Sequence, residues 1–287
     1  MAITDAEATI VSETMQAQLF QDSTAAGLMN GEVEPGQVVG KGRTLRIMKV
    51  ETLITTPYDG VTPMVGHAPT PTYVDVPIDQ AEATQVDLDD AQAAVLNIKL
   101  ATPYGIAAGR AMATAFDKDV YHVWDTEATP LFAAGSPAVN TPFYIGDATK
   151  LEGAVDLLAE LAIKLDDAHV PAEGRFAVAG PRFCSLLARD IRFLRSTPLG
   201  DETLLTGQVG VAEGFRVIKT TNIYDPYGVY AGHTIAGACI PVLSKAEQLR
   251  STVLFQDILR FLSVWGRKIT RPEALVKGIW TLTPPSA

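Results

Sequence analysis

The sequence predicts an α+β fold, and three of its features indicate this class. Residues 44–79 hold two segments rich in β-branched residues on either side of a stretch dense in proline and glycine. Two helical patterns follow between residues 103 and 171, and the second carries an apolar stripe along one side. Short strand patterns and turns then dominate the remainder of the chain.

The N-terminal residues predict a helical arm. Residues 4–20 favour a helix, because Thr4 and Asp5 can cap it and apolar residues recur at near-helical spacing. The segment has too few large apolar residues to be anchored alone. We therefore expect this arm to lie on a neighbouring element or subunit.

A long β-hairpin is predicted next. TLRIMKVETLIT (Thr44–Thr55) and TYVDVPID (Thr72–Asp79) favour strands, and the second alternates at Val74, Val76 and Ile78. The prolines and glycines between them predict an irregular tip. At ~3.3 Å per residue each arm could reach roughly 40 Å. A two-stranded hairpin is only marginally stable alone, so we expect it to lie on another subunit.

Two helices are predicted in the middle of the chain. The first covers Pro103–Val123, and the second runs from an N-cap at Asp147 to a stop at Pro171. We expect Glu160 and Lys164 to pair on the solvent side of the second helix. Its apolar stripe consists of Leu151, Val155, Leu158, Ala162 and Leu165. Such a helix would be a rod of about 30 Å.

The C-terminal half is predicted to be mainly strands. GRFAVAGP (Gly174–Pro181) favours a short strand, which a helix over Pro181–Leu194 follows. In TGQVGVAEGFRVIKTTN (Thr206–Asn222) the glycines fit no phosphate-binding spacing, and the residues after them alternate as a strand does. We interpret these glycines as turn residues. Residues 229–243 favour one strand, and a turn at Arg271-Pro272 separates the last two strands.

Composition limits the function classes. The chain has 287 residues, 47% of them hydrophobic, which suffices for one large domain or two moderate ones. The net charge of -10 argues against a dedicated nucleic-acid binder. Cys184 and Cys239 lie in apolar contexts that favour buried thiols over a disulfide, although the two could pair. We expect no secretion signal and no membrane span.

Four segments, in this order and spacing, resemble one protein family. They are the strand and turn GRFAVAGP after a helix that ends at Pro171, the segment G-x-V-G-x-x-x-G-F-x-V (Gly207–Val217), AGHTIAGACIPV (Ala231–Val242) and VWGRKITRPEALV (Val264–Val276). With the arm and the hairpin, the correspondence covers nearly the whole chain. The chain resembles the major capsid proteins of tailed bacteriophages, which share the Hong-Kong-ninety-seven-type fold with encapsulins.

The resemblance implies a division of the chain. Residues 1–30 would be the N-terminal arm and 31–86 the extended hairpin loop. Residues 87–172 would form the peripheral domain with its long spine helix, taken as the second predicted helix. Residues 173–261 would be the axial domain, and 262–287 would return into the peripheral domain. The glycines of Thr206–Asn222 would then turn strands inside the axial domain.

The resemblance also implies a function. The chain would be a structural protein that assembles with itself as pentamers and hexamers into an icosahedral shell. The shell would enclose double-stranded DNA without sequence-specific binding, in a virion assembled in the bacterial host cytoplasm. Portal, a separate scaffolding protein and decoration proteins would be the partners, with no membrane and no cofactor. Two alternatives remain open: an encapsulin-type nanocompartment, which would hold an enzyme cargo, and an α+β enzyme.

No catalytic, cofactor-binding or metal residues are predicted. His67, His122, His169 and His233 share no metal-binding spacing, and no serine-hydrolase motif occurs. Adjacent carboxylates at 89–90 and 166–167 diverge on a helix and cannot share one site. The basic set Arg182, Arg189, Arg192 and Arg195 is either a solvated surface, a partner for acidic residues of a neighbouring subunit, or a nucleic-acid contact.

Overall fold

The described part of the chain combines helices and strands and confirms the predicted α+β class. The computed structural model describes residues 23–30, 44–49, 72–89, 101–131, 143–145, 153–190 and 210–282. The helices are α3 (Ala101–Glu127), α4 (Ala154–Asp167) and α5 (Pro181–Arg189). The strands are β1 (Thr44–Lys49), β2 (Thr72–Pro77), β3 (Gln80–Asp89), β4 (Thr129–Pro130), β5 (Phe143–Ile145), β6 (Arg175–Ala179), β7 (Val211–Ala212), β8 (Phe215–Lys219), β9 (Gly228–His233), β10 (Gly237–Arg250), β11 (Gln256–Ile269) and β12 (Leu275–Leu282).

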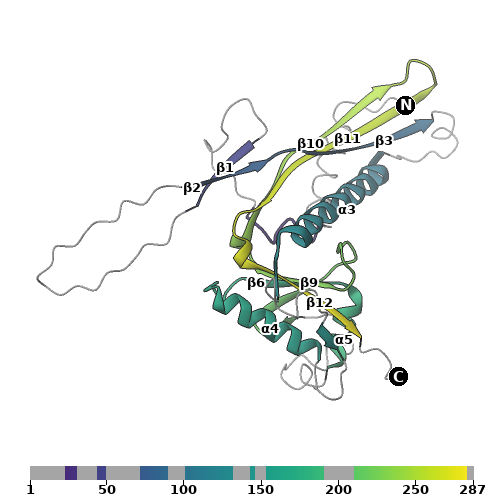
Figure 1. The fold of residues 1–287 in the computed structure, drawn as a ribbon. Coiled ribbons are helices and arrows are strands. Elements are labelled where there is room, and N and C mark those ends of the chain that lie inside the picture. Colours follow the sequence, from purple (N-terminus) through teal and green to yellow (C-terminus); the bar gives the residue numbers. More distant parts are fainter. Residues whose placement is uncertain are drawn as a thin grey trace, which may run out of the picture.

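A long antiparallel sheet in the order β10-β11-β3 forms one side of the molecule. The pairing of β10 with β11 runs from Gly237 opposite Ile269 to Arg250 opposite Asp257. Helix α3 lies along this sheet (Figure 1). Phe116 of α3 meets the ring of Trp265 of β11 edge-on at 5.5 Å between centroids, which fixes the helix on the sheet.

A second sheet lies at the opposite end of the molecule, in the order β4-β12-β9-β6-β8-β7, with β5 paired to β12. Helices α4 and α5 lie beside its strands (Figure 1). Every residue of β6 is buried, as expected of a central strand. Trp124, near the end of α3, stacks on Phe176 of β6 at 5.5 Å. Helix α3 therefore reaches both sheets, and one continuous apolar core joins them.

Strands β1 and β2 form the predicted antiparallel pair and lie beside the long sheet, where β2 leads into β3 (Figure 1). One face of the pair carries Leu45 and Val76, which pack against Ala238 and Ile240 of β10. The predicted strand over Thr44–Thr55 is described only to Lys49, and the predicted tip lies outside the described residues. This buried face attaches the described root of the hairpin to the long sheet.

The second predicted helix is shorter than expected. Helix α4 begins at Ala154 with Gly153 as its N-cap, where the Asp156 carboxylate accepts the Gly153 N–H at 2.7 Å. The predicted cap Asp147 lies outside the described residues. Among the described residues the longest helix is instead α3, with 27 residues and a length of about 40 Å.

The predicted apolar stripe of this helix is also corrected. Leu158 and Leu165 are buried as predicted, whereas Val155 and Ala162 are only half-buried. Leu157 and Leu161 take their place, because the helix packs on β12 and β9 with a face rotated from the predicted one. Leu151 lies outside the described residues.

Two strand predictions need correction. The segment 229–243, predicted as one strand, is divided by a 3₁₀ turn at Thr234–Ala236 into β9 and β10, which belong to different sheets. Strand β3 was not predicted, because its sequence QAEATQVDLD is mostly polar. It is an edge strand whose side chains are largely exposed, so its polarity is compatible with pairing along β11.

Other predictions in the C-terminal half are confirmed. Glu213 and Gly214 both have positive φ, 48° and 79°, and join β7 to β8 as a two-residue hairpin turn. Gly214 is thus a turn glycine, as interpreted from the sequence, whereas Gly207 lies outside the described residues. A 3₁₀ turn at Pro272–Ala274 separates β11 from β12 at the predicted turn.

The packing groups the elements differently from the predicted division. Helix α4, predicted to belong with residues 87–172, packs with the sheet of β6, β9 and β12. Strand β10, predicted to belong with residues 173–261, pairs instead in the long sheet beside α3. Within the described residues, no helix is both long and apolar enough to cross a membrane.

Replacing Leu158 with Asp should prevent stable folding. Leu158 is fully buried on α4, so the change would place an unpaired carboxylate in the core at a cost of at least about 3 kcal/mol. Ile163→Asp on the same helix is the matched control, because Ile163 is exposed. Circular dichroism during thermal melting checks this. A Leu158→Asp variant that melts as cooperatively as the control would contradict the assigned packing of α4.

Candidate interaction surfaces

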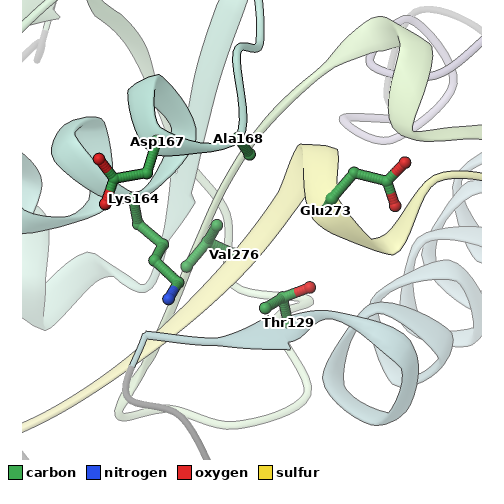
Figure 2. A pocket seen from close by; sticks show the side chains of 6 residues that line it. All are labelled: Thr129, Lys164, Asp167, Ala168, Glu273 and Val276. Carbon is green, nitrogen blue, oxygen red and sulfur yellow. The ribbon is translucent and has the colours of Figure 1, made fainter. Parts of the chain in front are cut away.

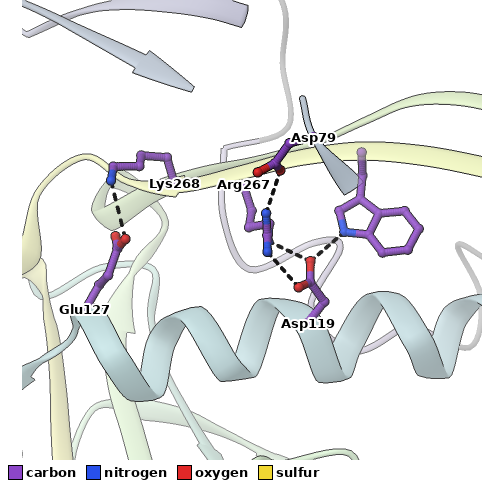
Figure 3. A network of polar contacts seen from close by, with 6 residues as sticks. Asp79, Asp119, Glu127, Arg267 and Lys268 are labelled. Atoms are coloured by element: carbon purple, nitrogen blue, oxygen red, sulfur yellow. Dashed lines mark hydrogen bonds and ion pairs between the residues drawn. The ribbon is translucent and has the colours of Figure 1, made fainter. Parts of the chain in front are cut away.

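A polar cluster at the VWGRK segment joins α3, β11 and the exit of the hairpin (Figure 3). Arg267 donates from Nη1 to Asp79 Oδ1 at 2.7 Å and from Nη2 to Asp119 Oδ1 at 2.8 Å. Its Nε lies 2.6 Å from Asp119 Oδ2, and the Trp265 indole N–H donates to the same oxygen at 2.8 Å. Arg267 and Asp119 are mostly buried and form a close ion pair. Its hydrogen bond comes from Nη2, because the nearby Nε–H makes none, so the contact is charge-assisted through one N–H.

Neighbouring residues extend this contact, and we call the whole cluster the α3–β11 joint. Lys268 Nζ lies 3.4 Å from Glu127 Oε1, and the Ile269 N–H donates to the other Glu127 oxygen at 3.3 Å. A Cβ on Gly266 would lie 2.7 Å from the Pro77 carbonyl oxygen, so only glycine lets the hairpin exit pass this close. The segment VWGRK, part of the fourth segment that resembles the capsid family, is thus explained by the structure. Its residues 265–268 each make a contact that the joint needs.

Asp117 is a fully buried carboxylate that holds an N-terminal segment, residues 23–30, which we call the strap. It accepts hydrogen bonds from Ser23 Oγ (2.6 Å), Thr24 N (3.0 Å), Thr24 Oγ1 (2.9 Å), Ala25 N (3.1 Å) and Asn222 Nδ2 (3.1 Å). Within the described part of the chain no cation pairs with Asp117. The donors alone satisfy the charge, which is the requirement for burying a carboxylate.

The strap is fixed at its other end by β10. Asn30 donates its N–H to the Gly237 carbonyl and accepts from the Cys239 N–H, both at 3.1 Å. The predicted arm (residues 1–30) is described only from Ser23, and the strap connects it to the hairpin. The strap, which lies between the N-terminal arm and the hairpin loop in the sequence, is therefore held by α3 at one end and by β10 at the other.

The outer face of the hairpin root is exposed and partly apolar. Met48 and Tyr73 lie opposite each other in the register and are 56% and 52% exposed. Beside them Arg46 forms a forked ion pair with Asp75 at 2.8 and 3.2 Å, and its guanidinium lies 5.7 Å from the Tyr73 ring centroid. An exposed ion pair adds little stability, but this one orders the face.

A second exposed apolar group lies where β10 turns into β11. Val253, Leu254 and Phe255 are 87%, 61% and 84% exposed. We call residues 251–255 the tip. Such consecutive exposure of large apolar side chains marks an interaction surface more often than a solvated loop.

A shallow pocket of about 230 Å³ lies between α4 and the start of β12 (Figure 2). Its charged residues are Lys164, Asp167 and Glu273, and the two carboxylates point in opposite directions in Figure 2. The Thr129 hydroxyl donates to the Pro272 carbonyl at 2.6 Å. The one hydroxyl that lines the pocket is therefore engaged by a backbone carbonyl.

The described histidines lie apart. His122 is exposed and meets Tyr224 edge-on, and His169 is exposed at the end of α4. His233 is buried, with Nε2 2.8 Å from the Glu173 carbonyl oxygen and Nδ1 accepting the Ile235 N–H. His67 lies outside the described residues. Among the described residues no three histidine, cysteine or acidic side chains gather in a way that could hold a metal ion.

Both cysteines are free and buried, in agreement with the sequence interpretation. Burial raises the pKa of the Cys184 thiol to about 11, and it also raises the pKa of Cys239. Raised pKa values leave little thiolate at neutral pH. Neither thiol is therefore suited to act as a nucleophile.

The remaining predicted charge features are partly described. Asp166 forms an ion pair with Arg175 at 2.7 Å, whereas Asp167 lines the pocket, so the two carboxylates diverge as predicted. Arg182 and Arg189 are exposed on α5. Asp90, Arg192 and Arg195 lie outside the described residues.

Solved structures of similar fold span almost the whole chain. A structure from Mycobacterium phage Che8 has 25% sequence identity and a TM-score of 0.71, over 89% of this chain and 90% of that one. The capsid structure of the Cyanophage P-SCSP1u has 15% identity and a TM-score of 0.65, over 90% and 92%. A virus-like particle from Pyrococcus furiosus has 12% identity and a TM-score of 0.58, over 94% and 98%. No protein-family model and no curated protein matches the chain.

Replacing Asp117 with Ala should release the strap and destabilise the subunit. The change leaves buried donors without an acceptor, at a cost of about 2–4 kcal/mol in free energy of unfolding. Lys118→Ala is the matched control, since Lys118 is exposed on the same helix. Urea unfolding together with hydrogen exchange of residues 23–30 measures both effects. Equal stability and equal strap protection in the two variants would show that Asp117 does not hold the strap.

Proposed function

We propose that this chain, which has the fold of the phage capsid structures, is the major capsid protein of a tailed double-stranded DNA phage. The observation that carries the proposal is the likeness over about nine-tenths of both chains, at 25% identity, to the structure from Mycobacterium phage Che8. Many copies associate as pentamers and hexamers and close into an icosahedral shell around the genome.

The surfaces support this role. A shell subunit needs extended elements that reach its neighbours and many modest interfaces that add up. The hairpin root, with its exposed outer face at Met48 and Tyr73, and the tip are apolar surfaces that nothing in the described chain covers. The strap and the α3–β11 joint hold the bases of these elements, so contacts between subunits act on a rigid frame.

The packing suggests an assignment of the parts of the capsid fold. Residues 1–30 are the N-terminal arm, and residues 31–86 form the extended hairpin loop. The peripheral domain contains α3 and the sheet of β10 and β11, to whose edge the end of the loop segment adds β3. Helix α3 is the spine helix in place of the segment 147–171. The axial domain contains α4, α5 and the second sheet, so β4, β5 and β12 join it from outside the segment that holds α4 to β9.

The charge is compatible with a shell that encloses DNA without binding a sequence. The net charge of -10 disfavours tight overall binding to DNA phosphates, so packaged DNA can leave again. The protein is part of the virion and assembles in the host cytoplasm. Portal, a separate scaffolding protein and decoration proteins are its further partners.

A protein nanocompartment shell is the second candidate. The virus-like particle from Pyrococcus furiosus shares the fold over 94% of this chain, so the fold also occurs in a particle that is described as virus-like. The two functions differ in content, because a capsid holds DNA whereas a nanocompartment holds an enzyme cargo. The phage capsid structures have the higher TM-scores and therefore favour the first function.

Negative-stain microscopy of the purified chain tests the proposal. We expect closed shells of uniform size from the wild type. A variant lacking residues 59–71, the predicted end of the extended hairpin loop, should stay folded but fail to close shells. Its shortened loop would no longer reach a neighbouring subunit. Wild-type protein that remains monomeric or forms only small discrete oligomers would contradict the shell function. In native particles, nuclease-protected DNA supports the capsid, and a co-purifying enzyme supports the nanocompartment instead.

A further inference from the structure

Helix α3 separates its charged side chains between the body of the protein and the solvent. None of its four acidic residues is exposed: Asp117, Asp119, Asp125 and Glu127. Its two cations, Arg110 and Lys118, are both exposed. They belong to a set that we call the basic stripe, which consists of the exposed residues Ala107, Arg110, Ala111, Lys118 and His122. The outer side of α3 is therefore basic, although the chain as a whole has a net charge of -10.

Each acidic residue of α3 is bound to groups on the body side of the helix. Asp117 accepts five hydrogen bonds from the strap and Asn222. The other three pair with cations of β11 and β12: Asp119 with Arg267, Glu127 with Lys268, and Asp125 with Lys277. Three of the four negative charges are thus cancelled within the body, and they do not neutralise the cations of the basic stripe.

The positive groups of the basic stripe are spread along the helix. Arg110 and Lys118 lie about 12 Å apart along the axis, and His122 lies about 6 Å further on. Lys118 forms no ion pair with another residue in the part of the chain that the structure describes. Groups this far apart cannot converge on one small anion. They can, however, contact successive charges of an extended polyanion.

Small side chains keep the rest of the basic stripe flat. Ala107 and Ala111 lie beside Arg110 and project only a methyl group from the helix. Helix α3 is a rod of about 40 Å on one side of the long sheet (Figure 1). Double-stranded DNA is also a rod, with one phosphate charge per about 1.7 Å of its axis. The shape and the charge of the basic stripe therefore both fit a DNA backbone.

An acidic surface of another protein fits the basic stripe less well. Interfaces between proteins depend on large side chains, above all aromatic ones, that are buried in well-packed pockets. The apolar members of the basic stripe are alanines, which provide no such anchor. Interfaces with DNA are more polar and more positively charged. The composition of the basic stripe therefore favours DNA over a protein partner.

We propose that the basic stripe of α3 faces the interior of the shell and contacts the phosphates of the packaged double-stranded DNA. This inference rests on the proposed capsid function and adds a surface for the genome to it. Contacts to phosphates carry no sequence information. Two cations and a histidine per subunit give only a weak contact, so the genome can still leave.

Lysine acetylation tests the contact on the wild-type protein. DNA-filled native particles and empty shells of the purified chain are treated with a small acetylating reagent, and mass spectrometry follows each lysine. Lys118 should react several-fold more slowly in filled particles than in empty shells, because phosphates cover its ammonium group. Lys245 of β10 is the matched control, since its side chain is 58% exposed and lies outside the basic stripe. Its rate should be the same in both particles.

The rates separate the possible occupants of the basic stripe. Equal rates for Lys118 in filled and empty particles would overturn the DNA contact and leave the shell function intact. Slow acetylation in both particles, compared with the free subunit, would also overturn it, since a neighbouring copy would then cover the basic stripe. Native particles that contain no DNA would contradict the capsid function, and this contact with it.

A photo-crosslink gives a second readout that does not depend on lysine reactivity. Ala111→Cys places a thiol in the basic stripe, and a thiol-reactive benzophenone should label it alone, because both native cysteines are buried. Irradiation of labelled, filled particles should attach subunits to DNA. Ile163→Cys is the matched control, since Ile163 is exposed on α4, and it should attach several-fold fewer subunits. Equal attachment by the two variants, or crosslinks from Ala111→Cys to protein alone, would overturn the proposal.

Discussion

The mostly buried ion pair between Arg267 of β11 and Asp119 of α3 is the interaction on which the rest of the structure depends. It fixes the helix against the long sheet, and through Asp79 it also fixes the point where the hairpin leaves the body. Further along the same helix, the side chains of Tyr121 and Trp124 are buried in the core that α3 shares with the second sheet. The orientation of α3 therefore sets the position of both sheets, the strap and the hairpin root.

Charged side chains are buried where α3 meets the strap and β11, and apolar side chains are exposed on the hairpin root and the tip. Asp117, Asp119 and Arg267 occupy mostly buried positions, where hydrogen-bonded charges specify one arrangement more strictly than apolar packing does. Met48, Tyr73 and the tip are apolar and exposed. For an isolated subunit this pattern costs solubility, whereas for a shell subunit it gives a rigid frame with surfaces left for its neighbours. The distribution of side chains is thus consistent with the function proposed from the fold.

Much of the fold was predictable because its signals are local. The Glu213-Gly214 turn, the strand over Arg175–Ala179 and the turn before the last strand depend on neighbouring residues and were predicted from the sequence. The polar edge strand β3 and the buried face of α4 depend on partners distant in the sequence, so periodicity did not predict them. The roles of Asp117 and Asp119 were missed for the same reason. Their partners lie between 92 and 148 residues away, and nothing in FDKDV distinguishes a buried carboxylate from a solvated one.

A double-mutant cycle on the α3–β11 joint tests the central claim most directly. Asp119→Asn, Arg267→Gln and the combined variant are unfolded in urea as unassembled subunits, and the free energies of unfolding are compared with that of the wild type. A mostly buried ion pair on which the frame depends predicts a coupling energy of about 1–3 kcal/mol between the two residues. Effects that add to within about 0.5 kcal/mol would show that the two side chains act independently and would contradict this account.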